Sequence, residues 1–354
     1  MAIIGAGTKA NLLPPCDVYL TTVAPDKVSS AVVARQATIY PLEQMAGMRT
    51  LARDDLYVTA GAGTSLAEIQ TELVGSGMWL PLASPWPQAT LGGIIASAYN
   101  APLRMRYGGA RDLLLAATLV LYDGRIVRIG RPVVKNVAGY DLPRLCVGSQ
   151  GSLGLMADVT LKLAALPRAR TTLCLHCSDL SSALRYGYAL LPICLTASAL
   201  LLSGDAAGWQ IHYTAEGYPA DVHAELGEVR ATLARLGADP PAEVPESGSE
   251  IWATWLAASQ TDLTMRAGVA PSDLGALMRS HAPEASAWLA DLANGLLYLR
   301  DPGNPVALRS DALALEGYAV VMPGCAKPPE GFDPIGYPHA AAELEAALRG
   351  AFGS

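Results

Sequence analysis

The residues with the clearest potential for chemistry form a glycine- and serine-rich stretch, GSQGSLG, at residues 148–154. It runs into an alternating segment at residues 156–163 that predicts a β-strand. Glycines at this density let the backbone approach a ligand closely and turn its amides toward it. Taken alone, however, the stretch fits an ordinary turn before a strand better than it fits a binding loop.

A second segment with small side chains lies upstream. The sequence LPLASPWPQ at residues 80–88 is stiffened by prolines and leads into TLGG at residues 90–93, followed by IIAS. Because large side chains are absent here, we infer that something lies close against this backbone. The segment therefore adds a second candidate binding element to the first.

The first ten residues, MAIIGAGTKA, contain a GxGxxA pattern after a short apolar strand. A dinucleotide-binding fingerprint of this kind needs a long helix directly after the glycines, so that a pyrophosphate lies at the helix N-terminus. Pro14 and Pro15 cut any such helix to about a turn and a half. A Rossmann fold is therefore a poor interpretation, whereas a phosphate-holding loop without a long helix remains open.

The cysteines and histidines do not form a recognisable catalytic or metal-binding set. Cys174 and Cys177 form a CxxC, but the surrounding sequence alternates like a strand, which would send the two thiols to opposite faces. We expect reduced core cysteines rather than a zinc site or a disulfide framework. The five histidines are His176, His212, His223, His281 and His339. Their spacing is not that of metal ligands, so we predict no metal site.

Composition restricts the class of protein. The chain has 354 residues, enough for two domains or one large one, and it is 51% hydrophobic and 16% charged, which indicates a globular protein. Its formal net charge of −7 argues against nucleic-acid binding.

An uncharged run at residues 186–204 approaches the length of a membrane-spanning helix. Pro192 interrupts the run, so we predict a buried passage from helix to strand instead.

The elements expected around the candidate segments are mixed. Ser65 and Glu68 form a capping box that predicts a helix ending near residue 75. A basic loop, RMRYGGARD at residues 104–112, precedes a strand that we expect to be continuously buried, and the turn YDGR predicts a hairpin after it. The predicted strands lie at 17–22, 38–42, 55–60, 113–122 and 126–129, and a short helix lies at 26–35.

After Pro167, strand and helix patterns predict a second α+β domain with an antiparallel sheet. A proline- and acid-rich linker at residues 239–248 divides it. The predicted strands lie at 171–177, 196–203, 209–214, 263–269, 294–300 and 317–321. The predicted helices lie at 179–190, 220–236, 250–258, 271–281, 284–291, 304–314 and 338–350.

Five segments, taken in order, carry a resemblance to a known family. They are the loop at residues 4–9, TLGG, RYGGARDLLL, VVKNVAGYDL and GSQGSLG. The chain resembles the FAD-binding domain of the vanillyl-alcohol oxidase/PCMH flavoprotein superfamily, and within it most resembles the E-subunit family of bacterial glycolate oxidases. Each motif alone is weak, but five in this order and spacing are specific. The resemblance is clear over residues 55–167 and weaker toward both ends.

The resemblance implies an α+β architecture in which two subdomains hold an extended FAD and a separate cap domain follows. We expect a PCMH-type FAD-binding domain at 1–167, an α+β cap domain at 168–325, and a C-terminal tail with a helix at 326–354. The family has a strand–helix–strand unit ahead of the first loop, so we expect an abbreviated N-terminus here. The family's covalent flavin histidine is absent, which implies non-covalent FAD.

The resemblance also assigns residues. The implied FAD-binding positions are Gly5, Ala6, Gly7, Thr8 and Lys9 at the pyrophosphate, Thr90, Leu91, Gly92 and Gly93 along the pyrophosphate and ribityl chain, and Gly148, Ser149, Gly151, Leu153 and Gly154 along the isoalloxazine and adenosine side. Lys135, Asn136 and Tyr140 are weak candidates for catalysis near the flavin. The charge of Lys135 would favour anionic reduced flavin or a carboxylate substrate. Tyr140, together with Asp141, has an equal claim to pinning a turn.

Three functions follow as hypotheses. The first is a FAD-binding subunit that assembles with a catalytic D-type flavoprotein subunit and an iron–sulfur subunit to oxidise glycolate or a related small 2-hydroxy acid. The high apolar content supports such an assembly. The alternatives are a self-sufficient FAD-dependent alcohol or hydroxy-acid oxidase or dehydrogenase, and a flavin-free structural subunit. We expect a cytoplasmic protein, attached at most peripherally to the inner face of the cell membrane.

Overall fold

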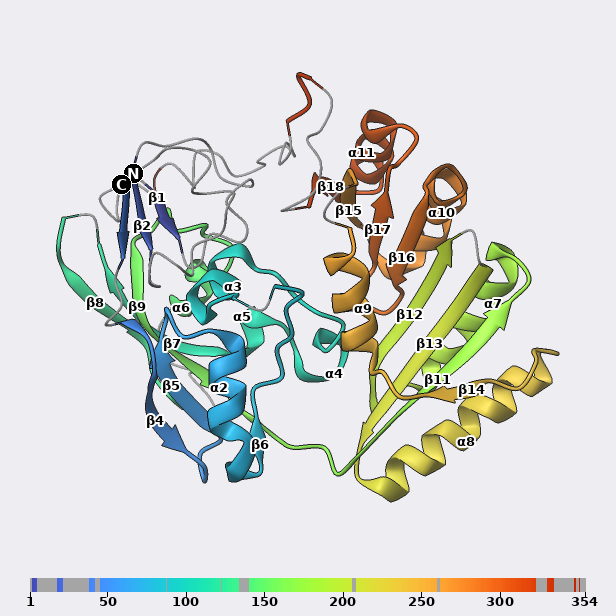
Figure 1. Ribbon diagram of the computed structural model, residues 1–354, viewed down its shortest axis with the longest axis horizontal. Coiled ribbons are helices and arrows are strands. Elements are labelled where there is room, and N and C mark those ends of the chain that lie inside the picture. The colour runs from blue at the N-terminus through green and yellow to red at the C-terminus, as the bar shows by residue number, and fades with distance from the viewer. Residues whose placement is uncertain are drawn as a thin grey trace. The chain divides into compact units, whose positions relative to one another are not determined.

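The computed structural model divides the chain into two compact units, coloured by residue number in Figure 1. Unit 1 comprises Met1–Ala101, Gly108–Leu166 and Pro338–Ser354, and unit 2 comprises Pro102–Tyr107 and Pro167–Tyr337. The mixed helices and antiparallel sheets confirm the predicted fold class. The residues that the structure describes are 2–4, 18–21, 38–41, 45–86, 88–121, 123–133, 140–205, 208–259, 262–322, 330–333, 347 and 350.

Unit 1 is built on a five-stranded antiparallel sheet with the order β4-β5-β9-β7-β8. Its strands are β4 Met48–Ala52, β5 Tyr57–Gly61, β7 Leu114–Val120, β8 Ile126–Gly130 and β9 Leu155–Lys162. The β7–β8 pairing confirms the predicted hairpin. Two smaller sheets accompany it: the parallel β1 Ala2–Ile4, β2 Val18–Thr21 and β3 Thr38–Pro41, and the antiparallel pair β6 Met78–Trp79 with β10 Ala164–Ala165.

Short helices pack on this sheet and close its apolar core. They are α2 Leu66–Leu73, α3 Leu91–Ser97, α5 Ala110–Leu113 and α6 Pro143–Cys146, with the 3-10 turn η4 Val74–Ser76. The predicted capping box on α2 is confirmed, because Ser65 Oγ accepts from the Glu68 N–H and the Glu68 carboxylate accepts from the Ser65 N–H. Ile69 of α2 and Ile95 of α3 are fully buried against Val58 and Leu161 of the sheet.

Unit 2 is built on an eight-stranded antiparallel sheet, which confirms the predicted sheet type. Its order is β14-β11-β13-β12-β16-β17-β15-β18. The strands are β11 Ala169–Cys177, β12 Ala197–Asp205, β13 Gly208–Gly217, β14 Ala242–Val244, β15 Thr264–Gly268, β16 Ala287–Asp291, β17 Leu296–Arg300 and β18 Tyr318–Val321.

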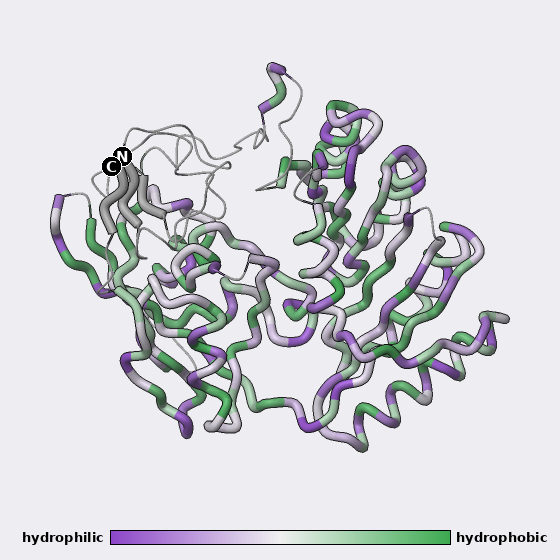
Figure 2. Tube along the Cα trace, viewed as in Figure 1, coloured by the Kyte–Doolittle hydropathy of each residue, from purple (hydrophilic) through white to green (hydrophobic). Residues whose placement is uncertain are grey.

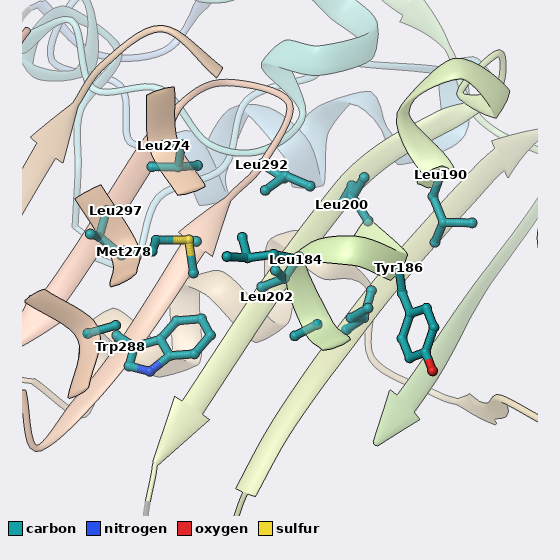
Figure 3. Close-up of a cluster of buried hydrophobic side chains, with 14 of the residues drawn as sticks. Leu184, Tyr186, Leu190, Leu200, Leu202, Leu274, Met278, Trp288, Leu292 and Leu297 are labelled. Carbon is teal, nitrogen blue, oxygen red and sulfur yellow. The ribbon is translucent and has the colours of Figure 1, made fainter. Parts of the chain in front are cut away.

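Four helices bury their apolar sides on one face of this sheet: α7 Leu180–Leu190, α8 Pro219–Arg235, α10 Pro271–His281 and α11 Pro305–Ala314. In Figure 3, Leu184 of α7 lies near Leu202 of β12, with Trp288 of β16 in the same cluster. Figure 2 shows the alternation of hydrophilic and hydrophobic residues along α8 that this one-sided burial requires. Helix α9 Gly248–Ala257 contacts the opposite face of the sheet. Gly248 lies so close to Ala199 of β12 that an added methyl group would overlap the Ala199 Cβ.

Three predictions about elements are wrong. Residues 284–291, predicted as a helix, contain the 3-10 turn η6 Ala282–Glu284 and the buried strand β16. A short apolar run does not distinguish a buried strand from a buried helix, and here pairing with β12 and β17 decides.

The 239–248 linker contains strand β14, paired with β11. Strand β7 is shorter than 113–122, and four of its seven side chains are only half-buried. The predicted helices at 26–35 and 338–350 lie outside the described residues, apart from positions 347 and 350.

The apolar run at 186–204 contains the end of α7, the 3-10 turn η5 Leu191–Ile193 and most of β12, which confirms a passage from helix to strand. No helix among the described residues is long and apolar enough to cross a membrane. Cys174 and Cys177 lie on β11 as predicted, the first buried and the second half-buried, and both are free thiols.

Candidate cofactor-binding site

Helix α3 is the element that brings two of the predicted binding segments together. Thr90 caps its N-terminus, with the Thr90 Oγ1 accepting a hydrogen bond from the Gly93 N–H at 3.2 Å. Leu91, Ile94 and Ile95 turn into the core. The remaining side of the helix therefore presents only small residues.

Gly92 is small because the chain's own backbone lies against it. Its N–H donates to the Ala62 carbonyl at 2.8 Å, and a methyl group at this position would lie 2.9 Å from the Ala62 Cβ. We inferred from the sequence that something lies close against the backbone of the TLGG segment. At Gly92 this neighbour is the turn at residues 61–64. Gly92 therefore allows the close contact between α3 and the turn at residues 61–64.

That turn, GAGT, is a part of the site that sequence reasoning missed. The Gly63 N–H donates to the Met45 carbonyl at 2.7 Å, and the buried Thr64 hydroxyl accepts from the Gly47 N–H at 2.8 Å. A methyl group at Gly61 would lie 2.1 Å from the Met45 carbonyl oxygen. The sequence signal was two glycines between the predicted strand at residues 55–60 and the capped helix.

The second predicted segment meets α3 at its C-terminal end. The Gly148 N–H donates to the Ile95 carbonyl at 3.0 Å, and the Gln150 N–H donates to the Ala96 carbonyl at 2.8 Å. Both residues have positive φ, 81° at Gly148 and 50° at Gln150. The loop amides thus donate to carbonyls of the last turn of α3, where the Ile95 carbonyl also accepts from the N–H of the C-cap residue Ala98. The two glycine-rich segments therefore lie at opposite ends of one short helix.

The later residues of the GSQGSLG loop face the interior. Leu153 is buried, and a methyl group at Gly154 would lie 2.7 Å from the Val120 carbonyl oxygen. Gly151 has a φ of 79° and Gly154 one of 139°, which explains why glycine occupies both positions. These contacts fix the loop to β7 and β9, and any contact of Gly151, Leu153 or Gly154 with a cofactor stays a prediction.

A strip of small, incompletely buried residues remains along the site. On α3 it comprises Gly93, Ala96 and Ser97, which share one helix face, and on the loop it comprises Gly148 and Ser149. Among the described residues, a methyl group at Gly93 would meet only Thr90 Oγ1, and one at Gly148 only Ala98 Cβ. At both positions, therefore, few described atoms lie close to the backbone on this side.

The remaining predicted positions divide into two groups. Tyr140 is 91% exposed, and the neighbouring Asp141 forms a 2.6 Å ion pair with Arg144 at the start of α6. This pair supports the interpretation that Asp141 pins a turn. Seven further positions lie outside the described residues: Gly5, Ala6, Gly7, Thr8, Lys9, Lys135 and Asn136.

Three groups with displaced pKa values were not predicted from the sequence. Burial raises the pKa of the Cys146 thiol, two residues before the loop, to about 12, which keeps it protonated. In unit 2, burial raises the pKa of Asp291 to about 7 and lowers that of His212 to about 4. Asp291 accepts hydrogen bonds from the Asn294 backbone and side chain. Within the described ranges, no three His, Cys, Asp or Glu side chains gather as a metal site.

Comparison with known proteins gives a family match in the N-terminal part of the chain. The family described as "FAD binding domain" matches residues 26–130. The glycolate oxidase subunit GlcE of Escherichia coli (strain K12) is 41% identical over 121 residues, which are 34% of this chain and 35% of GlcE. The mitochondrial D-lactate dehydrogenase [cytochrome] of Arabidopsis thaliana is 29% identical over 164 residues, 45% of this chain and 29% of that protein. The matches thus span about a third of the length of these relatives.

A solved alkyldihydroxyacetonephosphate synthase shares the fold, with a TM-score of 0.68 at 13% identity, over 99% of this chain and 71% of its own. The family match covers the TLGG segment and helix α3, where the strip of small residues lies. Residues 26–130 therefore match a FAD-binding domain, and FAD is the cofactor of such a domain.

Proposed function

We propose that the chain is the FAD-binding subunit of a complex that oxidises glycolate or a related small 2-hydroxy acid. The observation that carries this proposal is the 41% identity with a glycolate oxidase subunit. FAD, when bound, would accept the hydride that leaves the substrate carbon, while the hydroxyl proton is lost and a 2-oxo acid forms. The electrons would then pass to an iron–sulfur partner.

In this proposal the described residues hold the flavin rather than perform the proton transfer. Thr90, Gly93 and Gly148 would line the cofactor, while Gly92 and the turn at residues 61–64 hold α3 in place. None of the predicted catalytic candidates that the structure describes is placed in the strip, since Tyr140 is almost fully exposed. The catalytic flavoprotein partner is therefore proposed to supply the base.

A second candidate is a self-sufficient flavin dehydrogenase for a 2-hydroxy acid. The identity with a D-lactate dehydrogenase supports it. The match to a FAD-binding domain leaves the third hypothesis, a flavin-free structural subunit, without support.

Visible absorption separates the two candidates. The full chain, purified alone and after co-expression with its proposed partner subunits, is mixed anaerobically with glycolate or D-lactate. The subunit proposal expects the chain alone to hold FAD without bleaching, and the assembled complex to bleach. Bleaching of the isolated chain would favour the self-sufficient enzyme. A colourless chain that stays colourless after addition of FAD would refute both.

The cofactor position has its own test. Gly93→Leu places a side chain on the open side of α3, while Gly227→Leu places one on the open surface of α8 in unit 2. We expect Gly93→Leu to lose FAD and Gly227→Leu to retain it. Retention of FAD by both variants would contradict the assignment of the strip.

A further inference from the structure

The segment between α3 and α5 leaves unit 1 and returns to it. Helix α4 Arg104–Tyr107 lies in this segment, and residues 102–107 belong to unit 2 although the residues on both sides belong to unit 1. We call residues 98–110 the excursion. It begins directly after Ser97, the last residue of the helix that carries the cofactor strip.

The two ends of the excursion are tied together within unit 1. The Asn100 Nδ2 donates to the Ala98 carbonyl at 3.0 Å, and the Asn100 Oδ1 accepts from the Ala110 N–H at 2.9 Å. Ala98, the C-cap of α3, has a φ of 50°, and Gly108 has a φ of 81°. The excursion is therefore a closed loop with a defined neck, and both of its turns require left-handed backbone.

The tip of the excursion is held by a buried carboxylate of unit 2. The Tyr107 hydroxyl donates to Glu216 Oε1 at 2.8 Å, while Glu216 Oε2 accepts from Arg170 Nε at 2.5 Å. Glu216 is only 1% exposed, so each of its oxygens has a partner inside the protein. Burial, followed by the Glu216 charge, raises the pKa of Tyr107. The phenol therefore stays protonated and remains a donor.

The excursion starts where the two cofactor segments meet. Its first residue, Ala98, lies two residues after Ala96, whose carbonyl accepts from the Gln150 N–H. A loop that moves at this point would disturb the last turn of α3 and the backbone of Gly148 and Gln150 with it. A loop already ordered in the free protein leaves less conformational entropy to be lost when a ligand binds.

We infer that Tyr107 is a positioning residue for FAD: its hydrogen bond to Glu216 orders the excursion and thereby the C-terminal end of α3 and the Gly148–Gln150 backbone. The inference rests on the proposed placement of FAD along α3.

The test is FAD affinity in Tyr107→Phe of the full chain, with a matched control. Tyr213→Phe removes an equivalent bond, because the Tyr213 hydroxyl donates to the buried Glu225 at 2.7 Å within unit 2, and neither residue belongs to the excursion. FAD binding is titrated at a temperature at which all variants are folded. We expect Kd to rise about tenfold in Tyr107→Phe, since hydrogen bonds to charged groups are among the stronger ones, and to stay unchanged in Tyr213→Phe.

Amide hydrogen exchange gives a readout that does not need the cofactor. In the FAD-free chain, exchange at Gly148 and Gln150 should be faster in Tyr107→Phe than in wild type or Tyr213→Phe. Unchanged exchange at both amides overturns the inference, as does an equal rise of Kd in the two variants. A wild-type chain that binds no FAD refutes the proposed function, and the inference with it.

Discussion

Burial of His212 and of Asp291 in the sheet of unit 2 changes the free energy of unfolding in opposite directions as the pH rises from about 4 to 7. His212 is buried on β13 and, among the described residues, its Nδ1 has no hydrogen-bond partner. Burial and then the charge of His176 lower its pKa, against a smaller opposing effect of Glu246. Asp291, fully buried at the end of β16, has a raised pKa. Because the two effects oppose each other, they partly cancel in the pH dependence of the free energy of unfolding. Variants that remove one of the two groups separate them.

The first prediction concerns His212→Leu. Between pH 6.5 and about 4 the unfolded chain binds a proton at His212 that the folded chain does not, so acid lowers the free energy of unfolding. The loss is about 3 kcal/mol, at about 1.4 kcal/mol for each pH unit. Urea unfolding from pH 4 to pH 7 should show this loss in wild type and its absence in His212→Leu. His223→Leu on the surface of α8 is the control, and an equal slope in all three proteins would contradict the prediction.

The second prediction concerns Asp291→Asn. The folded chain keeps its proton up to about pH 7, whereas the unfolded carboxyl releases it near 3.8. The contribution of the protonated carboxyl to stability is therefore complete below pH 3.8 and is lost as the pH rises to 7. We expect Asp291→Asn to remove about 4 kcal/mol of this decline, measured by the same urea titrations. Asp221→Asn, at the exposed start of α8, should leave the profile unchanged, and a matching change there would attribute the effect to net charge.

At the scale of elements, the close contact between α3 and the turn at residues 61–64 leads to a third prediction. A methyl group at Gly92 would overlap Ala62, whereas one at Gly227 in α8 would meet nothing within 4 Å. Gly92→Ala should therefore lower the free energy of unfolding by about 1–3 kcal/mol through overpacking. Gly227→Ala should raise it by up to about 1 kcal/mol, because alanine favours the helix. Thermal unfolding in the absence of FAD measures both effects, and a stabilised Gly92→Ala variant would show that α3 can move away from the turn at residues 61–64.

The elements that could be predicted are those whose signals are local. The Ser65–Glu68 capping box fixed the start of α2, and period-3.6 patterns located α7, α8, α10 and α11. Strand β16 could not be separated from a helix, because its five residues are all buried and only its partners β12 and β17 decide.

The site shows the same division. The glycine-rich segments could be found from the sequence, because glycine density is visible in it. That α3 joins them could not be predicted, since it depends on the hydrogen bonds from Gly148 to Ile95 and from Gln150 to Ala96. The roles of individual glycines likewise depend on tertiary contacts: Gly92 faces Ala62 and Gly154 faces Val120, whereas a methyl group at Gly93 would meet only Thr90 Oγ1.

At the scale of the whole molecule, each unit has its own hydrophobic core. The core of unit 1 gathers around Ile69, Leu91 and Leu161, and that of unit 2 around Leu184, Leu202 and Trp288. The tryptophans are unevenly divided: Trp79 and Trp86 in unit 1, and Trp209, Trp252, Trp255 and Trp288 in unit 2. Tryptophan emission therefore reports mainly on unit 2, while flavin absorbance would report on unit 1.

The last prediction uses this division. FAD at about 100 times its Kd should stabilise the folded state that binds it by about 2.7 kcal/mol. If the excursion couples the thermal stability of the two units, FAD should raise the temperature at which the tryptophan signal of the wild-type chain is lost. The rise should be smaller in Tyr107→Phe, because the Tyr107–Glu216 hydrogen bond is then absent. Tyr213→Phe should respond as wild type does. An equal delay in all three proteins would show that flavin binding stabilises unit 2 by another path, and no delay in wild type would show that the two cores unfold independently.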